Sequence, residues 1–227
     1  MKQKIFLLFI VFTVWFTSCT DSNKIQYPDT KKVDQVDEYF GIKVEDPYRW
    51  LEDDRSSETE AWVKSENQVT ADYLAQIPFR EKIKNRLTEL FAFETITSPV
   101  KKGDSYYYFK EDGVQDQPVL YMRKSADNEP VVLIDPNKLS EDGTVAMDKD
   151  FAISNDGKYI AYQISKAGSD WHEILVKEIK TGKDLEDRVK WVKFSDIAWY
   201  KNGFYYSGYS AAGEGEELTE LNRFQKV

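Results

Sequence analysis

Few residues in this chain could act as a nucleophile, a general base or a metal ligand. A serine hydrolase raises its nucleophile on a Gly-x-Ser-x-Gly turn between a strand and a helix, with a histidine and a carboxylate within reach. The nearest string, Gly208-Tyr209-Ser210-Ala211-Ala212, lacks the final glycine. No helical pattern follows it, so we predict a turn there and no nucleophile.

His172 is the only histidine and Cys19 the only cysteine. The histidine stands in a strand-like pattern, where we expect its side chain to face solvent. One histidine and one cysteine cannot assemble a zinc site or a Cys-His pair. The acidic clusters at 52–54 and 214–217 lack the spacing of a calcium loop. We therefore expect no catalytic residue, no metal site and no cofactor in this chain.

Two amphipathic helices, separated near Pro78, are predicted over residues 57–91. Ser57 and Glu60 have the spacing of a capping box at a helix start. The apolar positions are Trp62, Val69, Tyr73 and Ile77 in the first helix and Phe79, Ile83, Leu87 and Leu90 in the second.

From about Gly103 onward the apolar pattern alternates, which predicts strands at 105–109, 119–122 and 131–134. Gly103, Gly157 and Gly203 each precede an aromatic strand, at intervals of 54 and 46 residues. A four-stranded propeller blade has roughly 40–50 residues, so about two and a half blades fit before Val227. A propeller removes its exposed edges by closing a ring of about four to eight blades, so we do not expect this chain to close one alone.

The N-terminus has the layout of a secretory leader. Lys2 and Lys4 precede an apolar run from Ile5 to Phe16, which is short for a membrane span. Phe16-Thr17-Ser18-Cys19 resembles a bacterial lipobox with phenylalanine in place of the usual leucine. We predict a lipoprotein-type signal peptide over residues 1–18, lipidation of Cys19 and a tether over residues 19–26. Plain cleavage without lipidation is the alternative.

Charge and composition narrow the function further. The net charge is −9 at pH 7, and −11 once a leader with two lysines is subtracted. Nucleic-acid binding needs clustered cations, and no basic stripe is present, so we exclude nucleic acid as a partner. A hydrophobic share of 41% suffices for a packed core. The expected location is outside the cytoplasm, as a periplasmic or membrane-anchored bacterial lipoprotein.

Several stretches resemble prolyl oligopeptidases, in the same order and over about residues 27–227. They are Val44-Glu45-Asp46-Pro47-Tyr48-Arg49-Trp50-Leu51-Glu52, then residues 62–70, 73–74, 77–80, 135–144, 168–171 and 192–199. The related oligopeptidase B branch shares the Asp-Pro-Tyr-Arg-Trp-Leu start, but the later stretches are more similar to prolyl oligopeptidase.

The resemblance implies an α+β chain with two parts. Residues 27–95 would be the N-terminal helical segment of an α/β-hydrolase domain, and residues 96–227 an incomplete β-propeller of about two to three blades of seven. In this family the propeller covers the active site and admits short peptides while excluding folded proteins. A Ser-Asp-His triad cleaves after proline without metal or cofactor. The triad belongs to the C-terminal hydrolase domain, so no catalytic residue can be carried over.

Three residues can be carried over as substrate-binding positions. Phe194 matches the family phenylalanine that projects from the propeller into the substrate cleft beside the proline pocket. Asp170 and Trp171 match a motif that borders this cleft. The residues alone leave open a second interpretation, in which Phe194 is a core side chain of a blade.

We therefore interpret the chain as the N-terminal part of an exported, lipid-anchored, serine-type prolyl oligopeptidase that is inactive by itself. The implied partners are short proline-containing peptides, a missing C-terminal α/β-hydrolase domain and a membrane reached through Cys19. We expect aggregation, because the Trp62 face and an open sheet edge lack partners. The alternatives are a non-catalytic β-rich surface lipoprotein that binds a peptide or glycan, and an S9-type peptidase that cuts after basic residues.

Overall fold

The computed structural model describes residues 25–213, 215–217 and 220–227. They divide between two compact units, one up to Asn85 and one from Arg86 onward. The predicted leader and the lipobox cysteine Cys19 lie outside the described residues. The predicted domain limits at 26/27 and 95/96 stay predictions. No helix in the described part of the chain is both long enough and apolar enough to cross a bilayer.

The first unit begins with a hairpin that the sequence analysis did not anticipate. Strands β1 (Val36–Tyr39) and β2 (Ile42–Glu45) pair antiparallel, with Tyr39 opposite Ile42. The two turn residues, Phe40 and Gly41, have φ angles of 54° and 82°. Positive φ at both central residues is the mark of a type I′ turn, whose twist suits a two-residue hairpin.

Arg49 ties this hairpin to the short 3₁₀ helix η1 (Arg49–Glu52). Its guanidinium donates to Asp37 on β1, and its Nε donates to Asp46 Oδ2 at 2.6 Å. The hydrogen bond from Arg49 holds the pKa of Asp37 below its usual value. The charged residues of the Asp-Pro-Tyr-Arg-Trp-Leu stretch thus fix local structure.

The two predicted helices are confirmed as α2 (Ser57–Ala75) and α3 (Arg80–Phe91), on either side of Pro78. The predicted capping box of Ser57 and Glu60 is wrong by one residue. Ser56 has extended backbone geometry, and its hydroxyl accepts from the Thr59 amide at 3.1 Å. That geometry makes Ser56 the N-cap, so Ser57 is already helical.

Only part of the apolar face of α2 is covered within the first unit. Trp62 donates to the Thr30 hydroxyl at 3.0 Å and meets Trp50 edge to face, with ring centroids 6.5 Å apart. Tyr73, farther along α2, is about half exposed. So are the apolar side chains of α3, which are Ile83, Leu87, Leu90 and Phe91.

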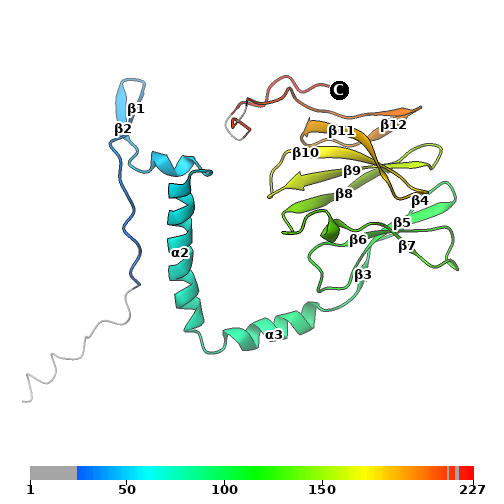
Figure 1. Ribbon diagram of the computed structural model, residues 1–227, viewed down its shortest axis with the longest axis horizontal. Coiled ribbons are helices and arrows are strands. Elements are labelled where there is room, and N and C mark those ends of the chain that lie inside the picture. Colours follow the sequence, from blue (N-terminus) through cyan, green and yellow to red (C-terminus); the bar gives the residue numbers. More distant parts are fainter. Residues whose placement is uncertain (1–24, 214, 218–219) are drawn as a thin grey trace, which may run out of the picture. The chain divides into compact units, whose positions relative to one another are not determined.

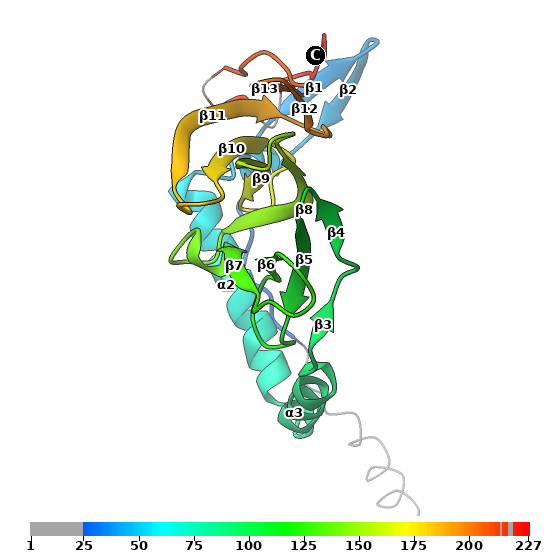
Figure 2. The same cartoon turned by 90° about the vertical axis from the view of Figure 1, so that its right-hand side faces the viewer.

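The second unit stacks three antiparallel sheets (Figures 1 and 2). The first sheet contains β3 (Thr95–Ile96), β4 (Val100–Lys102), β5 (Ser105–Glu111), β6 (Val119–Arg123) and β7 (Val131–Ile134). After the 3₁₀ helix η2 (Pro136–Lys138) comes the second sheet, β8 (Val145–Ile153), β9 (Tyr159–Lys166), β10 (His172–Glu178) and β11 (Asp184–Val192). The third sheet pairs β12 (Ala198–Tyr200) with β13 (Gly203–Tyr205).

The predicted change from helices to strands is confirmed, and the strands predicted at 105–109, 119–122 and 131–134 are β5, β6 and β7. The glycines of the predicted repeat do not share one conformation. Gly103 and Gly157 have positive φ, whereas in the third turn Lys201 has the positive φ and Gly203 does not. The repeat therefore shows where a turn precedes a strand, but the three turns are not of the same type.

Two apolar clusters bind the three sheets together. The cluster between the first and second sheets consists of Tyr107, Phe109, Leu120, Leu133, Ile134, Val145, Ile153, Ile160, Tyr162 and Ile164. The smaller cluster, between the second and third sheets, consists of Ala161, Ile174, Val176 and Val192, with Trp199 and Phe204 packed against it. Strand β9 contributes to both clusters, since alternate side chains of a strand point to opposite faces.

The substitution Ile160→Ala should lower the free energy of unfolding by about 2–5 kcal/mol, because Ile160 is fully buried and its loss leaves a cavity. Urea unfolding of the 227-residue chain measures this change. Val114→Ala is the matched control, since Val114 is 68% exposed in a loop. Equal losses for the two variants would contradict the assignment of the core.

Candidate functional site

The three predicted binding residues lie around one ammonium group, that of Lys193. Lys193 Nζ is 3.5 Å from Asp170 Oδ2. It lies 5.0 Å from the ring centroid of Trp171 and 5.7 Å from that of Phe194, within the range of cation–π attraction. The Lys193 side chain is only 15% exposed. The sequence analysis quoted Lys193 beside Phe194 without assigning it a role.

Phe194 is 76% exposed, so the interpretation of this residue as a core side chain is wrong. Its backbone has a φ of 52°, in the left-handed region that a bulky residue rarely adopts. Such a conformation costs about 1–3 kcal/mol and persists only where the surroundings enforce it. The exposed ring and the rarely adopted backbone conformation together make Phe194 a candidate binding residue.

Hydrogen bonds to Ser195, the next residue along the chain, hold the backbone at Phe194 in place. The Ser195 carbonyl oxygen accepts from Gln163 Nε2 at 2.8 Å. Its hydroxyl accepts from the Ser207 amide at 2.7 Å and donates to the Asp196 carbonyl. Gln163 is 3% exposed and comes from β9, so the buried centre of the second sheet holds the turn that presents Phe194.

Trp171 is enclosed by two further aromatic rings. Its ring meets Trp191 at 5.4 Å and Tyr209 at 5.8 Å between centroids, both edge to face. Its Nε1 donates to the Glu217 carbonyl oxygen at 2.8 Å. Trp191 has a φ of 61° and lies at a register shift between β10 and β11. A β-bulge of this kind turns the side chain of Trp191 away from the regular alternation of the strand.

His172 differs from the sequence prediction. Its side chain is only 19% exposed, so the expectation that it faces solvent is wrong. The Nδ1 atom lies 3.0 Å from the Asp170 carbonyl oxygen, and Nε2 lies 3.7 Å from Asp148 Oδ2. Asp148 lies in an irregularity of β8, which brings the carboxylate to the imidazole.

The Gly208 segment also differs from its prediction as a turn. Gly208 forms antiparallel bridges with both Val192 and Lys226, so it is extended chain between two partners. Ser210 accepts from Lys226 Nζ at 3.2 Å. Its hydroxyl therefore serves a local contact between two surface segments.

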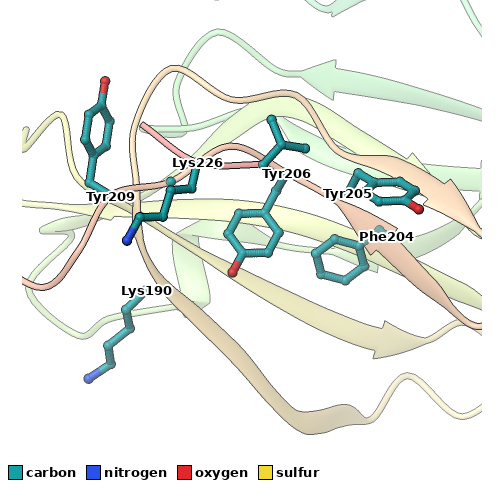
Figure 3. A pocket seen from close by; sticks show the side chains of 8 residues that line it. Lys190, Phe204, Tyr205, Tyr206, Tyr209 and Lys226 are labelled. Carbon is teal, nitrogen blue, oxygen red and sulfur yellow. The ribbon is translucent and has the colours of Figure 1, made fainter. Parts of the chain in front are cut away.

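Two pockets flank this aromatic region. One, of about 340 Å³, is lined by Lys190, Phe204, Tyr205, Tyr206, Gly208, Tyr209, Lys226 and Val227. Figure 3 shows Lys190 and Lys226 on one side of the Tyr206 ring and Phe204 and Tyr205 on the other. The second, of about 190 Å³, is lined by Trp171, Tyr209 and residues between 210 and 224. Phe194 and Asp170 line neither of these pockets. Across the described positions, no group of three His, Cys, Asp or Glu side chains could hold a metal ion.

The comparisons with known proteins agree with this architecture. Residues 28–227 match the family described as prolyl oligopeptidase, N-terminal beta-propeller domain. The chain belongs to this family, and the predicted resemblance is confirmed.

Individual relatives of the chain are prolyl endopeptidases and prolyl oligopeptidases. The prolyl endopeptidases of Elizabethkingia miricola and Elizabethkingia meningoseptica are 43% and 44% identical over 226 residues. Each alignment covers 99% of this chain and 32% of the relative, so the chain spans about a third of their length. Prolyl oligopeptidase B from Galerina marginata, bound to a 25mer macrocyclization substrate, superposes with a TM-score of 0.71 at 30% identity. That match covers 88% of this chain and 31% of the other.

The substitution Gln163→Leu should lower the free energy of unfolding by about 1–3 kcal/mol, because the Ser195 carbonyl loses its buried donor. Chemical unfolding of the chain measures this loss. The matched control is Gln76→Leu, whose amide donates to a carbonyl on the exposed surface of α2. We expect the control to change stability by less than about 0.5 kcal/mol. A Gln163 variant as stable as the control would contradict the anchoring role.

Proposed function

We propose that this chain is the N-terminal part of a prolyl oligopeptidase-like serine endopeptidase that hydrolyses short peptides after proline. The observation that carries the proposal is 43% identity to a prolyl endopeptidase along 99% of the chain. Because the chain spans 32% of that relative, the activity belongs to a protein of the relative's length. The surface-lipoprotein alternative has no support among these relatives, and the reported relatives favour cleavage after proline over cleavage after basic residues.

The three stacked sheets are, in this proposal, the first two to three blades of a seven-bladed propeller. The first and second sheets have the antiparallel order of blades, and the β12–β13 hairpin begins the next. The helices α2 and α3 then belong to the N-terminal segment of the α/β-hydrolase domain. The half-exposed apolar residues of α3, such as Ile83 and Leu87, supply a surface for that domain.

The propeller acts as a gate that admits short peptides, and Phe194 contacts the bound peptide in the substrate cleft. The exposed ring offers a flat apolar surface to a proline or a neighbouring side chain. Asp170 is 65% exposed beside Lys193, so it can meet a peptide amine or amide N–H at the border. Hydrolysis itself is acyl transfer by a Ser-Asp-His triad in the C-terminal domain.

The test is a proline-linked chromogenic peptide presented to two proteins, the 227-residue chain and a protein of the relatives' length that contains it. We expect the longer protein to release the chromophore and the 227-residue chain to release none. The substitution Phe194→Ala in the longer protein should lower kcat/KM about tenfold, because an aromatic contact with the substrate is lost. Phe194→Leu should retain part of the activity, and Val114→Ala all of it.

Two results would contradict the proposal. One is turnover by the 227-residue chain alone. The other is a longer protein that folds but cleaves none of a panel of proline peptides. If the longer protein is active and its Phe194→Ala variant has the same kcat/KM as the wild type, only the proposed role of Phe194 is contradicted.

We also propose that Cys19 is lipidated and that the protein is exported and anchored to a membrane. The support is the leader pattern with its lipobox-like Phe16-Thr17-Ser18-Cys19. Expressed in bacteria, the chain should enter the detergent phase on Triton X-114 partition and incorporate labelled palmitate. Cys19→Ser should abolish both while leaving export intact. Equal partition of the two forms would contradict lipidation.

A further inference from the structure

The ion pair at the candidate site joins a largely buried cation to an exposed anion. The side chain of Lys193 is 15% exposed and that of Asp170 is 65% exposed, with 3.5 Å between Lys193 Nζ and Asp170 Oδ2. The rings of Trp171 and Phe194 lie 5.0 and 5.7 Å from the same ammonium group. A carboxylate accepts several hydrogen bonds through its two oxygens, so Asp170 can accept from a further donor in solvent. The pair therefore presents its carboxylate to an approaching molecule.

The backbone of Asp170 is held by its neighbours. The Asp170 carbonyl oxygen lies 3.0 Å from His172 Nδ1. The Ser169 hydroxyl accepts from the Trp171 amide at 3.1 Å, and the Ser169 amide donates to the Lys166 carbonyl oxygen at 2.9 Å. A carboxylate on a tethered turn has a limited range, so its charge acts at a defined place in the candidate site.

Two opposite charges this close act on a third charge mainly through their difference. An ammonium group that approaches Asp170 is attracted by the carboxylate and repelled by Lys193, because both interactions fall only as the inverse of distance. Water and salt screen a largely buried charge less than an exposed one, so the repulsion from Lys193 is preserved. Lys193 thus cancels much of the attraction that Asp170 alone would exert on a basic peptide.

We propose that Lys193 determines the charge preference of the peptidase: it neutralises Asp170 and so prevents a preference for peptides with basic residues beside the proline. This inference rests on the proposed function. Without Lys193, Asp170 would be an exposed anion next to Trp171, and a carboxylate selects ammonium and guanidinium groups. The substrates are then proline peptides whose neighbouring side chains are uncharged. Lys193 acts through Asp170, so it is a positioning and specificity residue and not a catalytic one.

The test is the substitution Lys193→Met in the protein of the relatives' length. Methionine retains an unbranched apolar stem and removes the charge. Two chromogenic proline peptides differ only in carrying lysine or norleucine at the two positions before proline. The quantity measured is the lysine ratio, which is kcat/KM for the lysine peptide divided by kcat/KM for the norleucine peptide. We expect the lysine ratio to rise roughly three- to tenfold at low ionic strength and to rise less at high salt.

Three further variants separate the effect of charge from that of structure. Lys193→Arg retains the cation and should leave the lysine ratio near the wild-type value. Asp170→Asn should lower the ratio, because an unpaired Lys193 repels the peptide ammonium. This variant replaces an exposed side chain, so it tests the inference even if Lys193→Met fails to fold. The double variant Lys193→Met with Asp170→Asn should return the ratio to about its wild-type value, because neither charge remains.

The matched control is Lys177→Met, which breaks a similar ion pair away from Asp170. Lys177 is 12% exposed and its Nζ lies 2.8 Å from Asp184 Oδ1. It lies near the end of β10, whereas Trp171 immediately precedes the start of this strand. The loss of this pair can lower stability, but it should leave the lysine ratio unchanged.

The outcomes separate this inference from the proposed function. If the longer wild-type protein cleaves both peptides and Lys193→Met lowers kcat/KM equally for both, Lys193 has a structural role only, and the inference is overturned while the function stands. The same conclusion follows if Asp170→Asn leaves the lysine ratio unchanged. If the longer protein folds but cleaves neither these peptides nor other proline peptides, the proposed function fails and this inference fails with it.

Discussion

The second unit depends on one strand, β9, that is buried on both faces. Its residues from Ile160 to Ile164 are all buried: Ile160, Tyr162 and Ile164 belong to the larger apolar cluster and Ala161 to the smaller one, while Gln163 is a buried polar residue. It is hydrogen-bonded to β8 on one side and β10 on the other. Because the named strands of different sheets meet mainly through side chains, covering both faces of this strand contributes strongly to holding the stack together.

The same strand positions the candidate site. Gln163 lies within the buried run of β9, and its amide donates to the carbonyl oxygen of Ser195, the residue that follows the strained Phe194. The ammonium group of the largely buried Lys193 side chain lies close to Asp170, Trp171 and Phe194. The buried amide thus ties the turn that carries an exposed aromatic ring to the packed centre of the second sheet.

Sequence patterns predicted the parts of the fold where apolar residues recur. The helices α2 and α3 and strands β5, β6 and β7 followed from periodicity, and the family followed from motifs spread along the chain. Strand β11 was missed because its sequence is mostly polar, as suits an exposed edge. The β1–β2 hairpin was missed because its turn is Phe40-Gly41 and not Asn-Gly.

Site geometry was harder to predict, because it depends on contacts between residues far apart in sequence. The turn at Phe194 is held by hydrogen bonds from Gln163 and Ser207 to Ser195, and His172 is partly covered by Asp148 on another strand.

Hydrogen-exchange mass spectrometry of the 227-residue chain tests most directly the claim that the second unit depends on strand β9. The account predicts that peptides from β9 exchange slowest and that those from β11 and β13 exchange faster. Exchange in β9 as fast as in β11 would contradict a stack that depends on its doubly buried strand.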